Sequence, residues 1–120
     1  MTKRDPQSLL PLTPAMFHVL VALADGEIHG YAIMKSVEEL TGGAVRLSTG
    51  TLYGIIKRLL NDGLITELRA RPATPNDDER RRYYRLTTKG RDVAATEAQR
   101  LAKVVEIARS RRLLKKTQPA

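Results

Sequence analysis

The spacing of apolar residues changes along this chain, and the change constrains the fold more than any other feature of the sequence. Up to residue 62, apolar residues recur at intervals of three and four, as on an amphipathic helix. Over residues 64–70, and again over 81–86, they alternate with other residues, as on a β-strand with one buried face. Beyond residue 88 the helical spacing returns. The sequence therefore predicts helices, then two strands, then one further helix.

Three helices are expected before the strands. The first follows an N-cap at Thr13 and a proline at its first position, and it ends near residue 24. The second spans residues 31–40, and the third spans residues 49–60 behind the N-cap Ser48. The apolar residues of the third helix have the spacing of a stripe that faces a core: Leu52, Ile55, Ile56, Leu59 and Leu60.

The two alternating segments can pair as a hairpin. Between them, residues 71–80 contain two prolines and several charges, which cannot continue a ladder of backbone hydrogen bonds. A loop of this length in a small domain is usually functional or mobile. The order of helix, helix, helix, strand, loop, strand is that of a winged helix-turn-helix, so the expected fold class is mainly α with a small β-hairpin.

A long helix is expected from residue 88 to about 112, with Thr87 or Thr88 as its N-cap. Small apolar residues recur along it in steps of four and three, which suits pairing with another helix: Ala94, Ala98, Leu101, Val105 and Ala108. Because this stripe is too small to hold two chains together alone, Phe17 and Val21 of the first helix are expected to share the interface. A short chain buries only about two thirds of its unfolded surface, so a homodimer would complete the core.

The net charge of +8 is concentrated in the last third of the chain. Residues 1–79 contain 8 Lys or Arg and 10 Asp or Glu, a net charge of −2, whereas residues 80–120 contain 13 and 3, a net charge of +10. Clustered positive charge indicates a polyanion or an anionic surface as the partner. A solvated basic tail is the alternative that charge alone leaves open.

The third helix begins with residues suited to close contact with a duplex. In a helix-turn-helix, the first turn of the second motif helix meets the base edges, and small residues there let backbone and hydroxyl groups approach. The open face behind this turn carries a lysine, with an arginine and a tyrosine beside it, and three arginines begin the second strand. The expected contacts to double-stranded DNA are Ser48, Thr49, Gly50, Thr51, Tyr53, Lys57 and Arg58 from the helix, and Arg80, Arg81, Arg82 and Tyr84 from the wing.

These residues also allow simpler interpretations. Hydroxyl residues before a helix are often only caps, and Tyr53 could pack on the wing. Glycine inside a helix costs about 0.5–1 kcal/mol relative to alanine, so Gly54 indicates either a close approach or a tolerant site. The alternative class is a winged-helix adaptor that binds a protein or an anionic surface without reading a DNA sequence.

Three segments together resemble the PadR family of bacterial transcriptional regulators over roughly residues 10–110. They are HGYAIMKSVEEL, LSTGTLYGIIKRLLNDGLI and RRYYRLTTKG, although the family typically has proline where this chain has Gly54. The resemblance implies a winged helix-turn-helix with a C-terminal dimerisation helix, here of the shorter subfamily, in a repressor that binds a palindromic operator. It places residues 48–51, Tyr53 and Lys57 in the recognition segment and the arginine-rich strand in the wing. Some members of the family respond to phenolic acids or cationic drugs.

The expected organisation is a flexible N-terminal segment (1–10), a DNA-binding domain (11–86), a dimerisation helix (87–112) and a basic tail (113–120). An enzyme is not expected, because His18 and His29 have no carboxylate or nucleophile at a motif spacing, and neither a cofactor motif nor a metal-ligand cluster is present. No apolar run could span a membrane and no signal segment begins the chain, so a cytoplasmic location without a membrane partner is expected. The sequence leaves open whether a small-molecule effector exists, and a cavity between the first and last helices is the expected place for one.

Overall fold

The computed structural model describes residues 9–68 and 82–115 of the chain. The elements in chain order are α1 (Pro14–Ala22), β1 (Ile28–His29), α2 (Gly30–Leu40), α3 (Thr49–Asn61), β2 (Ile65–Leu68), β3 (Tyr83–Leu86) and α4 (Thr88–Ser110). This is the winged helix-turn-helix with a long C-terminal helix that the sequence predicts.

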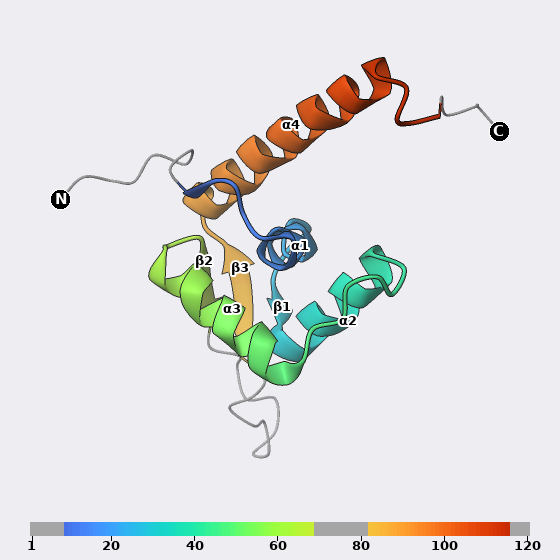
Figure 1. Ribbon diagram of the computed structural model, residues 1–120. Coiled ribbons are helices and arrows are strands. Elements are labelled where there is room, and N and C mark those ends of the chain that lie inside the picture. The colour runs from blue at the N-terminus through green and yellow to red at the C-terminus, as the bar shows by residue number, and fades with distance from the viewer. Residues whose placement is uncertain (1–8, 69–81, 116–120) are drawn as a thin grey trace, which may run out of the picture.

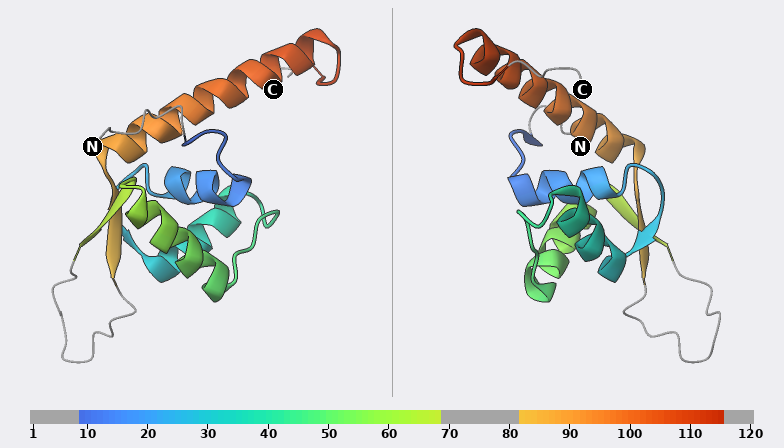
Figure 2. Two further views of the ribbon diagram at one scale, coloured as in Figure 1. Left: turned by 60° about the vertical axis from the view of Figure 1, so that its left-hand side comes forward. Right: turned by 90° about the vertical axis from the view of Figure 1, so that its right-hand side faces the viewer.

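The long helix and the third helix lie on opposite sides of the molecule. Figure 1 shows α1, α2 and α3 grouped beside the small sheet, with α4 running past them. In both views of Figure 2, α4 lies next to α1 and extends beyond it, whereas α3 lies on the far side of α1. None of the described helices has both the length and the apolarity that crossing a membrane requires.

Side chains cap each of the helices, as the sequence predicts for three of them. Thr13, Ser48 and Thr87 accept hydrogen bonds from the backbone N–H groups of Met16, Thr51 and Gly90, respectively, at 2.9–3.1 Å. The fourth cap is His29, whose Nδ1 accepts from the N–H of Ala32 at 3.2 Å. This bond agrees with a structural role for His29.

The sheet has three strands rather than the two of the predicted hairpin. The strand order is β1-β3-β2, and all pairs are antiparallel. Residues Ile28 and His29, expected to form only a connection, pair with Tyr84 and Tyr83 of β3. The predicted hairpin of β2 and β3 is confirmed. The sequence did not indicate β1, because a strand of two residues is too short to show an alternating pattern.

The hydrophobic core draws on every helix and on the start of β2. Fully buried side chains from these elements share a single cluster: Val19, Leu20, Ile33, Val37, Leu52, Leu59, Leu64 and Val93. Of the predicted stripe on α3, Leu52, Ile56 and Leu59 are buried, while Ile55 and Leu60 pack against the cluster from its edge. Replacing one of the buried leucines by alanine would cost about 2–5 kcal/mol of folding free energy, so the orientation of α3 is firmly set.

A hydrogen-bonded junction joins the end of α3 to the start of α4. Thr87 donates its backbone N–H to the Leu64 carbonyl at 3.1 Å and its hydroxyl to the Gly63 carbonyl at 2.6 Å. The Nζ of Lys89 donates to the carbonyl of Asp62 at 3.0 Å. The turn after α3 is therefore bound directly to the first turn of α4.

Candidate nucleic-acid interface

The first turn of α3 is exposed and has open space in front of it. Ser48, Thr49, Gly50 and Thr51 are all exposed. The Ser48 hydroxyl accepts from the Thr51 N–H and donates to the Thr51 hydroxyl at 2.9 Å, so the predicted cap is present. A Cβ added at Gly50 would meet no atom within 4 Å. The turn can therefore approach a flat or grooved partner with little steric hindrance.

The open face continues along α3. Gly54, Lys57, Arg58 and Asn61 are exposed, and a Cβ at Gly54 would also meet nothing within 4 Å. The opposite face is buried in the core, as described above. This segregation leaves one side of α3 polar, cationic and free of bulky side chains.

Tyr53 lies across the beginning of α2. Its side chain is 38% exposed, and its hydroxyl would be 3.2 Å from a Cβ added at the buried residue Gly30. A glycine at this position lets the tyrosine lie directly over the α2 backbone. Tyr53 thus lies against the first residue of α2, next to the open face of α3.

The structure places one of the predicted wing arginines. Arg82 is exposed, and its Nη1 lies 3.3 Å from Oε1 of Glu67 across the hairpin. Arg80 and Arg81 lie outside the described residues, as do residues 71–79 of the loop between the strands.

Tyr84, predicted as a DNA contact, belongs to the core instead. Its side chain is 3% exposed, and its strand position pairs with both Ile28 and Glu67. Burial, followed by the nearby Glu67 carboxylate, raises the pKa of its hydroxyl to about 12. Because alternate residues of a strand face opposite sides of the sheet, and Tyr84 faces the hydrophobic core, this residue cannot reach a DNA partner.

The residues predicted to form a dimer interface lie along α1 and α4. Val21 and Val105 are 38% and 42% exposed, Ala98 is also exposed, and the other four are partly buried: Phe17, Ala94, Leu101 and Ala108. Sequence reasoning missed further exposed apolar residues at the end of the chain: Val104, Ile107, Leu113 and Leu114. The apolar surface of α4 is therefore larger than the alanine-rich stripe suggests.

Glu97 is a further residue whose role the sequence did not indicate. It is 1% exposed, accepts a hydrogen bond from the Leu12 N–H at 2.8 Å, and pairs with Arg100 at 2.5 Å. The bond from Arg100 holds the pKa of this carboxyl below its ordinary value; burial opposes the shift, and the bond from Leu12 adds to it. Glu97 is therefore charged in the folded protein at neutral pH.

The fold and the exposed third helix define a winged helix-turn-helix regulator, and comparison with known proteins gives its family. Residues 19–96 match the model of the transcriptional regulator PadR-like family. The chain is 40% identical over 84 residues to the transcriptional regulator Rv3488 of Mycobacterium tuberculosis, a match that covers 69% of this chain and 70% of that protein. The chain belongs to the PadR-like family of transcriptional regulators.

Other proteins are similar to this chain in sequence or in fold. An uncharacterized 37.1 kDa protein in transposon TN4556 of Streptomyces fradiae is 38% identical over 90 residues, which is 75% of this chain but only 24% of that protein. A PadR family transcription regulator from Clostridium difficile superposes with a TM-score of 0.65 at 25% identity, covering 78% of this chain and 95% of its own. A transcriptional regulator from Clostridium thermocellum superposes with a TM-score of 0.66 at 23% identity, covering 79% and 89%.

Proposed function

We propose that this protein is a dimeric transcriptional repressor that binds a palindromic DNA operator through α3 and the wing. The observation that carries the proposal is the open polar face of α3, where residues 48–51, Gly54 and Lys57 are exposed while the other face is buried. A helix presented in this way fits the major groove with its first turn against the base edges.

Electrostatics support the same partner. The N-terminal end of α3 carries the positive end of the helix dipole, which favours a phosphate. Lys57 and Arg58 extend this positive surface along the helix, and Arg82 lies in the neighbouring wing. The sequence pI of about 10.2 also favours association with a polyanion.

The dimer is proposed because one α3 reads only one half-site. Two recognition helices must lie about 34–36 Å apart to enter successive major grooves on one face of the duplex. The C-terminal half of α4 carries apolar residues that could pack against a second copy of the chain, including Leu101, Val104 and Val105. Val21 of α1 is exposed as well. A dimer bound across a promoter would keep RNA polymerase from it, which is the proposed repressor action.

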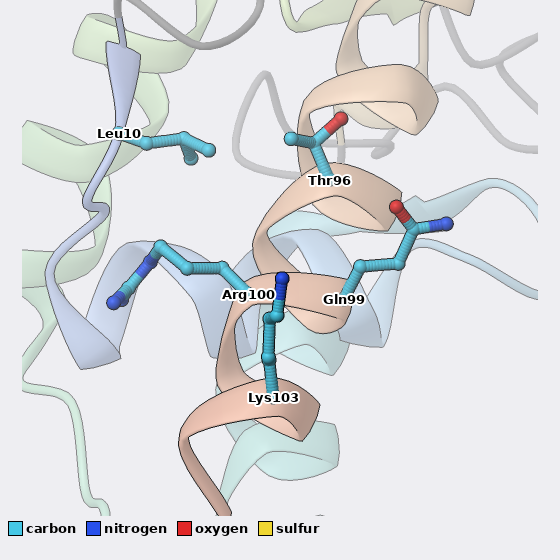
Figure 3. A pocket seen from close by; sticks show the side chains of 5 residues that line it. All are labelled: Leu10, Thr96, Gln99, Arg100 and Lys103. Carbon is cyan, nitrogen blue, oxygen red and sulfur yellow. The ribbon is translucent and has the colours of Figure 1, made fainter. Parts of the chain in front are cut away.

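The proposal includes a small-molecule effector that binds between the N-terminal segment and α4. A cavity of about 420 Å³ lies there, lined by Leu10, Thr96, Gln99, Arg100 and Lys103 (Figure 3). A ligand in this cavity would touch both segments, so it could favour one orientation of α4 over another. A changed orientation would move the two recognition helices relative to each other and release the operator.

The test is a mobility-shift titration on the DNA upstream of the protein's own gene, with random duplex as competitor. Lys57→Ala is compared with Arg111→Ala, which removes one positive charge from the exposed end of α4, on the other side of the molecule. We expect Lys57→Ala to weaken binding about tenfold and to lower the dependence of log affinity on log salt by about one, since one phosphate contact is lost. Arg111→Ala should bind like the wild type.

Two results would overturn the proposal. Equal binding by wild type and Lys57→Ala would show that α3 is not part of the DNA interface. Equal affinity for the promoter fragment and for random duplex would favour the adaptor class, which needs no sequence discrimination.

A further inference from the structure

Glu97 is the one charged side chain that is buried among the residues the structure describes. Its carboxylate is fully engaged, with one bond from the backbone of Leu12 and one from the side chain of Arg100. A buried carboxylate is costly unless it is hydrogen-bonded and paired. A carboxylate that is held in this way imposes a defined geometry on the groups around it.

The bond to Leu12 fastens α4 to the segment that enters α1. Leu12 is itself buried and immediately precedes the cap of α1 at Thr13. Within the part of the chain that the structure describes, two other hydrogen-bonded attachments join α4 to the body, and both lie nearer to its beginning. They are the junction at Thr87 and Lys89, and a 3.0 Å bond from the Arg91 guanidinium to the Ala24 carbonyl. Among the described residues, Glu97 therefore makes the last hydrogen bond from α4 to the body, and beyond it Leu101 is only partly buried.

The part of α4 beyond Glu97 is long enough that a small tilt of the helix displaces its far end by several ångströms. From Glu97 to the end of the helix at Ser110 the helix is about 20 Å long at 1.5 Å per residue. A tilt of about 10° about Glu97 would move the far end by about 3 Å, close to the rise of one base pair. In a dimer joined through this part of α4, a small change in tilt alters the separation of the recognition helices by a base-pair step.

We propose that Glu97 is a positioning residue that fixes the tilt of α4 and thereby sets the half-site spacing that the dimer accepts. This inference rests on the proposed function, because it requires a dimer that reads two half-sites. A buried residue that does not touch DNA would then help to determine which operators the dimer binds. A purely structural role would differ: loss of Glu97 would lower stability and weaken all operators equally.

The test uses two variants that match in size and lack the charge. The amide introduced by Glu97→Gln keeps an oxygen that can accept from the Leu12 N–H, whereas the thioether introduced by Glu97→Met is at best a weak acceptor. Glu106→Ala is the control, because Glu106 also pairs with an arginine three residues later but is exposed and makes no hydrogen bond to the described residues before α1. Affinities are measured for duplexes whose half-sites are separated by the best spacing and by one or two base pairs more or less.

We expect wild type, Glu97→Gln and Glu106→Ala to prefer one spacing by about tenfold over spacings two base pairs away, a preference similar to that for a matched over a mismatched base pair. For Glu97→Met the preference should fall to about twofold or less. A folded, dimeric Glu97→Met with the wild-type preference would overturn the inference. Failure of the wild type to bind any of the duplexes would instead contradict the proposed function.

A second measurement needs no DNA. The chain has no cysteine, so Asn61→Cys, at the exposed end of α3, gives one spin label per protomer. The label-to-label distance distribution in the dimer should be narrow for wild type and Glu97→Gln and broad for Glu97→Met. If Glu97→Met does not fold, Glu97→Ala is measured in its place. The smaller alanine side chain leaves room for water to hydrogen-bond to the Leu12 N–H. A narrow distribution in the folded variant would also contradict the inference.

Discussion

The backbone of Gly90 in the first turn of α4 rests directly on the carbonyl of Leu64, at the start of the wing. A Cβ at position 90 would lie 1.8 Å from the Leu64 oxygen, far inside any tolerable contact. The obstacle is backbone rather than the end of a flexible side chain, so a larger residue cannot be accommodated by a change of rotamer. The close approach of Gly90 brings Thr87 and Lys89 within hydrogen-bonding distance of the turn after α3.

Gly90→Ala is therefore expected to lower the free energy of unfolding by about 3 kcal/mol, because the two backbones must separate. Gly54→Ala is the control, since the space around Gly54 is open and alanine favours a helix; it should raise stability by about 0.5–1 kcal/mol. Urea denaturation of both variants measures the difference. An increase in stability for Gly90→Ala would show that the contact with Leu64 is not held in solution.

A second prediction concerns Gly54 and the approach of DNA. Gly54→Leu should fold normally, because the added side chain points into open space, but it should bind the promoter fragment at least about tenfold more weakly if α3 lies close to the duplex. Ala95→Leu, a similar enlargement at an exposed position of α4, should not alter binding. Unchanged affinity for Gly54→Leu would place Gly54 away from the DNA surface.

Local signals in the sequence were sufficient to predict the helices. Thr13, Ser48 and Thr87 mark helix starts because their hydroxyls satisfy free N–H groups, and these bonds are the ones observed. The apolar spacing on α3 then indicated which of its faces is buried. These features depend on neighbours within a few residues, so they can be read without knowledge of the fold.

Features that depend on distant neighbours could not be predicted in this way. Alternation separates Tyr84 from Tyr83 and Arg85 but does not tell which face of the strand packs on the core, because that face is set by residues distant in the sequence. A glutamate in a mixed helix such as α4 is usually exposed, and the partner that buries Glu97, the N–H of Leu12, is 85 residues away. The wrong assignment of Tyr84 and the omission of Glu97 therefore have the same cause.

The proposed interface of α4 is tested by Leu101→Asp. A charge at this partly buried position of the stripe should prevent two copies from packing and leave a monomer in sedimentation velocity. Affinity for the palindromic fragment should fall by about a hundredfold or more, because the second half-site no longer binds as part of one complex. Ala95→Asp, at an exposed position of the same helix, is the matched control and should remain dimeric.

The core position of Tyr84 predicts an unusual titration. Because its pKa is raised to about 12, the wild type should show a tyrosinate absorbance step near pH 12 that is missing in Tyr84→Phe. The raised pKa means that the neutral hydroxyl stabilises the fold below pH 10, and that this contribution is lost as pH rises toward 12. Tyr84→Phe should bind the promoter fragment like the wild type. A large loss of affinity would show that Tyr84 does contribute to the DNA interface.

Glu97 makes the free energy of unfolding depend on pH in the acid range, and the contacts of its carboxylate set the direction of this dependence. Its pKa is lower in the folded protein than the ordinary value of 4.5, chiefly because Arg100 binds the charged form. The carboxylate therefore stabilises the fold above pH 4.5, and the contribution is lost as pH falls through the lower, folded-state pKa. Urea denaturation between pH 3 and pH 7 should show the wild type losing its advantage over Glu97→Gln at the acid end. A stability difference that is constant over this range would mean that Glu97 is not held by Arg100 in solution.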